Sequence, residues 1–98
     1  MLFLVTWTFS DSSEEGSRRS LAVFAGWQPP AEVEFKGFYG FADGGGGAAI
    51  VESNDAAALA RTTAPFAPWL DFDIRPLLPI EEIAAIAGEG IAFRDSIS

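Results

Sequence analysis

The chain has 98 residues, of which 49% are apolar and 13% aromatic, a composition suited to one folded domain with a modest core. Fourteen acidic and six basic residues leave a formal net charge of −8, which argues against a nucleic-acid partner because phosphate binding requires a basic face. Cysteine and histidine are both missing, which removes disulfides, thiolate nucleophiles and the commonest metal and haem ligand, so we expect no metal and no cofactor.

The opening residues MLFLVTWTF predict a strand over Leu2–Phe9, because β-branched and aromatic side chains dominate it. Both faces of this strand are apolar or neutral, which favours a central position in a sheet. The segment is too short to span a membrane and lacks the basic start of a signal peptide. We therefore expect a cytoplasmic protein with no membrane association.

A helix is predicted after this strand. Asp11 or Ser12 is expected to cap it, with a glutamate three residues later completing a capping box. Leu21, Phe24 and Ala25 have the i, i+3, i+4 spacing of one apolar stripe. The Pro-Pro pair that follows is expected to end the helix and begin a loop.

Residues 33–42 predict a second strand that contains two glycines. Simple alternation places Phe35 and Tyr39 on one face, and Phe38 on the opposite face, where we expect it to meet a partner chain. Gly37 weakens the strand and is typical of a bulge or of a close approach by a ligand or another backbone.

Four consecutive glycines, Gly44 to Gly47, could suggest a phosphate-binding loop. A Walker loop requires the pattern GxxxxGK[ST] after a strand and before a helix. No lysine, serine or threonine follows these glycines directly, and residues 48–53 have the composition of a third strand. Asp-Gly and Gly-Gly pairs are instead favoured in hairpin turns, so the run is interpreted as a hairpin tip.

Asn54 and Asp55 predict the cap of a second helix, which two prolines at positions 65 and 68 should end or distort. Residues 71–78 predict a fourth strand with Phe72 and Ile74 turned inward and the charged residues turned outward. Because Pro76 cannot donate a hydrogen bond to a sheet, this strand is expected at an edge.

The C-terminal segment predicts a short amphipathic helix, with isoleucines at positions 80, 83 and 86 on one stripe. Gly88 and Gly90 are expected to end it. The tail over residues 91–98 is expected to be loose, as the last part of a single domain over residues 1–98.

The order of elements is β-α-β-β-α-β followed by a helix, which is the pattern of a ferredoxin-like sandwich. We therefore predict an α+β fold with a four-stranded antiparallel sheet. Two helices can cover only one face of such a sheet, so the other face needs a partner. A second copy of the chain, packed back to back to close an α+β barrel, satisfies this need.

Three segments, LFLVTWTF, GFYGFADGGGGAAIVESNDAAALA and APWLDFDIRPLLPIEE, resemble the DUF3303 family of small bacterial proteins. The resemblance spans most of the chain. It implies the fold of the dimeric α+β barrel proteins and a homodimer, and it implies no established activity. The wider superfamily includes cofactor-independent monooxygenases, isomerases and ligand-sensing domains, and the fold alone does not choose among them.

Six aromatic residues from separate elements are candidates for a ligand pocket between the sheet and the helices, or for plain core packing. They are Trp7, Trp27, Tyr39, Phe41, Phe66 and Trp69.

Three functions remain open. The first is a non-catalytic homodimeric domain that binds a small apolar or aromatic ligand. The second is a cofactor-independent monooxygenase or isomerase of the dimeric α+β barrel type, and the third is a purely structural or interaction module. Without histidine or cysteine for the common catalytic roles, we favour the first.

Overall fold

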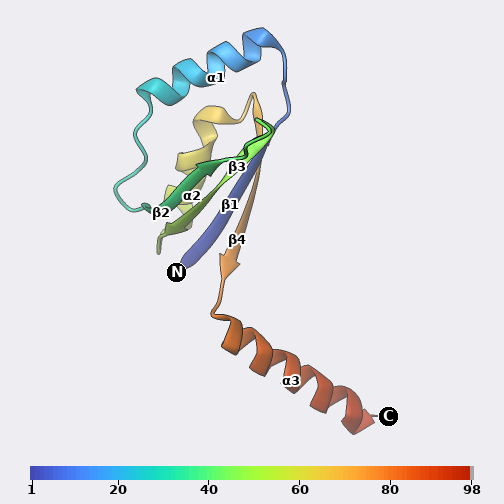
Figure 1. Ribbon diagram of the computed structural model, residues 1–98. Coiled ribbons are helices and arrows are strands. Elements are labelled where there is room, and N and C mark those ends of the chain that lie inside the picture. The colour runs from blue at the N-terminus through green and yellow to red at the C-terminus, as the bar shows by residue number, and fades with distance from the viewer. Residues whose placement is uncertain (98) are drawn as a thin grey trace.

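The computed structural model describes residues 1–97, and its four strands form one antiparallel sheet in the order β2-β3-β1-β4 (Figure 1). The strands are β1 (Leu2–Phe9), β2 (Glu34–Gly40), β3 (Gly46–Glu52) and β4 (Leu70–Leu77). The helices are α1 (Glu14–Gly26), α2 (Ala56–Thr63), the 3-10 helix η1 (Ala64–Phe66) and α3 (Ile80–Ile97). The predicted α+β, ferredoxin-like fold is confirmed.

Strand β1 occupies the centre of the sheet, as its two apolar faces predicted. Val5 pairs with Ala49 of β3 on one side and with Ile74 of β4 on the other. Strand β4 pairs only with β1 and is therefore an edge strand, as Pro76 predicted.

A bulge in β2 corrects the predicted orientation of Phe38. Phe35 pairs with Val51 and Phe38 pairs with Ala49, and the register shifts between Phe35 and Gly37. Val51 and Ala49 are two residues apart and face the same side, so Phe35 and Phe38 also share that side, which is the side of the helices. Simple alternation was wrong here because the extra residue of the bulge reverses every side chain that follows it.

The glycine run forms the hairpin tip between β2 and β3, as predicted. The Asp43 carboxylate accepts a hydrogen bond from the Gly45 N–H at 2.8 Å, and Gly44 has a φ of 75°, which favours glycine. Gly46 and Gly47 lie against β1, where a Cβ at residue 46 would overlap the Trp7 carbonyl and one at residue 47 would overlap the Trp7 indole. Gly44 thus allows the turn, and Gly46 and Gly47 leave space for Trp7.

The two helices after β1 and β3 are each capped by a side chain. Asp55 accepts hydrogen bonds from the N–H groups of the first turn of α2, as predicted. The cap of α1 is Ser13, whose hydroxyl accepts from the Gly16 N–H at 3.0 Å, so the prediction of Asp11 or Ser12 was wrong. The Asp11 carboxylate instead accepts from the Ser13 N–H at 2.9 Å and so supports the cap from outside the helix.

The buried core lies between the sheet and α2. Its members are small: Val5, Val33, Ala49, Val51, Ala58 and Leu59. Helix α2 contributes Ala58 and Leu59, whereas the only buried residues of α1 are Gly16 and Ser20. Helix α1 therefore covers the same side of the sheet without burying an apolar side chain of its own.

Helix α3 leaves the end of β4 and projects away from the sheet (Figure 1). It runs to Ile97, past the predicted end at Gly88 and Gly90, and residues 91–97 belong to it rather than to a separate tail. Among residues 1–97 only Gly44 and Gly46 have positive φ, so Gly88 and Gly90 keep helical backbone and weaken the helix without ending it. None of the helices formed by residues 1–97 has the length and apolar character needed to cross a bilayer.

Candidate ligand-binding cavity

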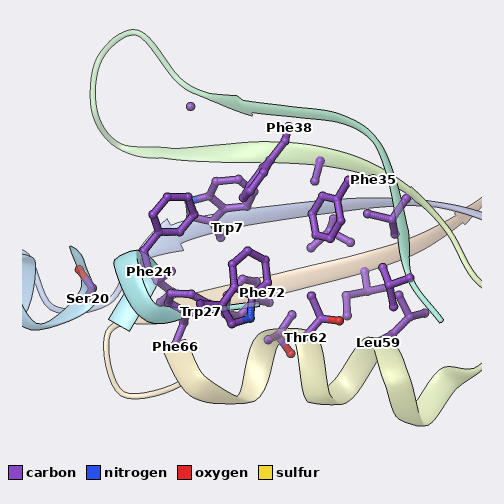
Figure 2. Close-up of a pocket in the computed structure, with 18 of the residues that line it drawn as sticks. Trp7, Ser20, Phe24, Trp27, Phe35, Phe38, Leu59, Thr62, Phe66 and Phe72 are labelled. Atoms are coloured by element: carbon purple, nitrogen blue, oxygen red, sulfur yellow. The ribbon is translucent and has the colours of Figure 1, made fainter. Parts of the chain in front are cut away.

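A cavity of about 360 Å³ lies between the sheet and the helices α1, α2 and η1, and all four strands contribute to its walls. Figure 2 shows Trp7 and Phe72 reaching it from the sheet, Phe24 from α1 and Thr62 from α2. The volume falls at the lower end of the range for small-molecule sites, about 300–1,000 Å³. Because α1 stands off the core, the cavity occupies the space that its apolar residues would otherwise fill.

Trp27 lies at the centre of the aromatic wall. It directly follows α1, where its N–H donates to the Phe24 carbonyl at 3.2 Å. Its indole contacts the Phe66 ring edge-to-face at 5.3 Å between ring centroids, and the Phe35 ring at 5.9 Å. Phe38 extends the wall, at 5.0 Å from Phe35 and 5.6 Å from Trp7. Edge-to-face contacts at these distances are favourable, so the rings hold one another in place around the cavity.

The polar groups at the cavity are few. The hydroxyls of Ser20, Thr62 and Thr63 each donate to a carbonyl of their own helix, which leaves their oxygens as hydrogen-bond acceptors. The indole N–H groups of Trp7 and Trp27 donate to no atom of residues 1–97. The lining residues therefore offer two indole N–H donors and three hydroxyl acceptors in an otherwise apolar wall.

Charge is missing from this wall. Of the described residues that line the cavity, none is an aspartate, glutamate, lysine or arginine. Tyr39 has the only ionisable side chain among them, and its ring lies over Gly37, where an added Cβ would be 2.8 Å from the ring. By register Tyr39 pairs with Ala48, on the side of the sheet away from the helices.

The six predicted site residues separate into two groups. Trp7, Trp27, Tyr39 and Phe66 line the cavity, although Tyr39 turns its ring to the other side. Phe41 follows the hairpin strand and donates its N–H to Gly46, and Trp69 accepts from the N–H groups of Ser10 and Asp11 through its carbonyl. These last two support loops and are not among the residues that line the cavity. Ligand binding by any of the six stays a prediction.

Five phenylalanines at the cavity were not among the predicted site residues: Phe9, Phe24, Phe35, Phe38 and Phe72. Phe24 had the spacing of an apolar helix stripe, which is usually a core signal. Phe35 and Phe38 share a face only because of the bulge. Gly37 between them was the one signal of this arrangement in the sequence.

Outside the cavity, Asp71 and Asp73 lie on the face of the sheet turned away from the helices, beside a shallow hollow of about 220 Å³. Arg75 donates to Asp73 at 2.8 Å, with both side chains more than half exposed. Within residues 1–97 no three acidic side chains gather closely enough to hold a metal ion. We interpret these aspartates as surface charges.

The family of the chain follows from a comparison of its sequence. The profile described as a domain of unknown function, DUF3303, matches residues 1–91. No curated protein matches the sequence. The match covers nearly the whole chain and every strand of the sheet, so the resemblance is confirmed and the chain belongs to the DUF3303 family.

Proposed function

We propose that this chain is a cytoplasmic, homodimeric domain that binds a small, neutral, aromatic or largely apolar ligand in the cavity between the sheet and the helices. The observation that carries the proposal is the uncharged aromatic wall around about 360 Å³ of space.

The apolar wall of the cavity disfavours a charged ligand. A carboxylate or ammonium group taken from water into an apolar site loses its hydration, and here no lining residue of opposite charge would compensate it. A neutral ligand with one or two oxygen atoms could accept from the indole N–H of Trp7 or Trp27. The same lack of carboxylates favours binding over acid–base catalysis.

The test is a titration of tryptophan fluorescence with two ligands of the same shape and different charge, 2-naphthol and 2-naphthoate. We expect saturable quenching by neutral 2-naphthol and at least about tenfold weaker binding of the anion. Equal binding of both, or binding of neither, would contradict the proposal. Conversion of the naphthol to a new absorbing product would instead support the oxygenase alternative.

Two matched variants locate the binding site. Trp27→Phe keeps an apolar ring and removes the N–H, so we expect 2-naphthol to bind several-fold more weakly, with Trp7 as the remaining tryptophan at the cavity. Trp69→Phe alters a tryptophan that does not line the cavity and should leave the affinity unchanged. Equal loss in both variants would place the ligand elsewhere.

The homodimer part of the proposal concerns the sheet face turned away from the helices. Leu4 pairs with Ile50, and Leu2 pairs with Leu77, so apolar side chains from β1, β3 and β4 adjoin on this face. None of the helices α1, α2 and η1 covers it. A second copy packed on the same face would bury these side chains symmetrically.

Sedimentation velocity tests the dimer. We expect twice the chain mass for the wild type and a monomer for Ile50→Asp, since the carboxylate would be buried without a partner. Ala31→Asp, at an exposed position in the loop before β2, is the matched control. A wild-type monomer would overturn this part and leave the ligand titration unaffected.

A further inference from the structure

Helix α3 carries an apolar face that nothing in residues 1–97 covers. No described residue of this helix is buried, and Ile80 and Phe93 are 72% and 65% exposed. At about 100° per residue, its large apolar side chains fall within one arc of about 160°, which also contains Arg94, and its acidic residues lie on the opposite arc. The apolar arc holds Ile80, Ile83, Ile86, Ile91, Phe93 and Ile97.

The connection from β4 keeps α3 away from its own sheet. Only Leu78 and Pro79 separate the two elements, and the Pro79 carbonyl accepts from the N–H groups of Glu82 and Ile83 at 3.0 and 3.2 Å. Proline fixes its own φ and holds the preceding residue extended. The helix therefore continues outward from the end of β4, and its apolar face requires a cover from outside this domain.

The exposed area is large enough for a stable contact between two chains. Residues of the chain expose 6781 Å² in total, which exceeds by more than about 1,000 Å² the roughly 5,400 Å² expected for a compact protein of this mass. A standard interface needs only about 800 Å² from each partner. The radius of gyration is 17.5 Å, which is also larger than the value of about 13 Å for a compact domain of 100 residues.

The chain also has an apolar surface of its own that could receive such a helix. On the α1 side of the cavity, Leu21 is 67% and Phe24 49% exposed, and Phe38 of β2 is exposed beside them. We call this surface, made by Leu21, Phe24 and Phe38, the cavity mouth. It leaves the cavity open to solvent.

The apolar character of the cavity mouth favours it over the outer face of the sheet as the place where α3 docks, because no described residue that lines the cavity is charged, whereas Asp71, Asp73 and Arg75 lie on the outer face. The helix is acidic, with Glu81, Glu82, Glu89 and Asp95 against Arg94. These acidic residues lie on the arc opposite the apolar one, so they stay in solvent when the apolar arc docks.

We propose that α3 is an exchanged arm, whose apolar face packs across the cavity mouth of a second copy of this chain. The ligand cavity of each protomer is then closed by residues of the other. This inference rests on the proposed homodimer and is independent of which ligand the cavity takes. The acidic arc of α3 then faces solvent.

The test uses the lack of native cysteine. Leu21→Cys and Phe93→Cys are made as separate full-length proteins, mixed, allowed to exchange subunits and treated with a short bismaleimide. We expect a linked pair of one copy of each protein by mass spectrometry. Ala85→Cys, on the opposite arc of α3, replaces Phe93→Cys in the control and should give no more linked pairs than random collision.

Other outcomes overturn the inference in distinguishable ways. A protein that carries both Leu21→Cys and Phe93→Cys tests closure within one chain. Linkage within this chain, with none between the two single variants, would mean that the arm closes its own cavity. Absence of linkage in a protein that sediments as a dimer would contradict the exchanged arm and leave the proposed sheet-face dimer unaffected. Binding of α3 to vesicles of neutral or anionic phospholipid, abolished by Ile83→Glu, would assign the face to a lipid surface instead.

A second measurement does not depend on cross-linking geometry. The double variant Ile83→Glu/Ile86→Glu should raise the dissociation constant of the dimer at least about 100-fold, since two buried isoleucines are lost. Ala85→Glu adds the same kind of charge on the solvent arc and should leave it unchanged. Equal effects of the two variants, or none, would contradict docking through the apolar arc.

Discussion

Helices α1 and α2 lie over the same side of one sheet, yet they contact it in different ways. Helix α2 presents Ala58 and Leu59, which are almost fully buried against β1 and β3. Helix α1 presents Leu21 and Phe24, which remain largely exposed. Small residues allow a close approach between helix and sheet, whereas large rings on α1 meet other rings across a gap.

The difference separates a closely packed side of the domain from a side that contains the cavity. The side of α2 supplies the close packing that stabilises the fold. Helix α1 does not pack closely against the sheet, and the space between them is the cavity. Aromatic contacts from Trp27 to Phe66 and Phe35 then hold the end of α1 near the sheet.

The largest expected effect comes from making the same substitution on each side. Phe66→Ala, at a buried position of η1, should lower the free energy of unfolding by about 3–5 kcal/mol. Phe24→Ala, in half-exposed α1, should lower it by less than about 1.5 kcal/mol. Urea unfolding followed by circular dichroism measures both.

An equal loss in both phenylalanine variants would mean that Phe24 is covered in solution. Dependence on protein concentration would then separate two causes. A loss that appears only at high concentration would indicate cover by a second chain, and a loss at every concentration would indicate collapse of α1 onto the sheet.

A smaller effect is expected at the base of the cavity. Gly47→Ala places a methyl group against the Trp7 indole and the Tyr39 carbonyl, and we expect a loss of about 1–3 kcal/mol together with a shifted tryptophan emission. Gly26→Ala, with open space around it at the end of α1, is the control and should be neutral or stabilising. An unshifted emission in Gly47→Ala would show that Trp7 does not lie over this glycine.

The smallest effect concerns pH at the start of α1. Hydrogen bonds from the Ser13 hydroxyl and N–H hold the pKa of the Asp11 carboxyl below its ordinary value of 3.8. A depressed pKa stabilises the fold above the unfolded value, and this stabilisation is lost as pH falls below about 3.8 through the folded value. We expect the amide signals of Ser13 and Gly16 to shift in that range by NMR, and Asp11→Asn to abolish the shift.

Much of the fold could be predicted because its signals are local. The alternation in β1, the glycine run of the hairpin, the Asp55 cap and the proline of β4 each report on a few neighbouring residues. The α1 cap was missed because Asp11, Ser12 and Ser13 are all good caps, and the choice among them depends on how the chain leaves β1.

The candidate site was harder to predict because it depends on geometry at a distance. Trp7, Trp27 and Phe66 could be selected as aromatics from separate elements, but the inward position of Phe38 depends on where one extra residue enters β2. The length of α3 depends on the backbone conformation at Gly88 and Gly90. Glycine can either continue a helix or adopt the conformation that ends one, so the sequence alone does not decide between the two.

The two edges of the sheet bear on whether a chain with so much apolar surface exposed can aggregate by strand addition. Exposed sheet edges can recruit further strands and begin aggregation. Here β4 carries Pro76, which has no N–H to offer an incoming strand, and β2 is interrupted by its bulge after Phe35. Growth by strand addition is thus hindered at both ends of the sheet, which disfavours open-ended fibres.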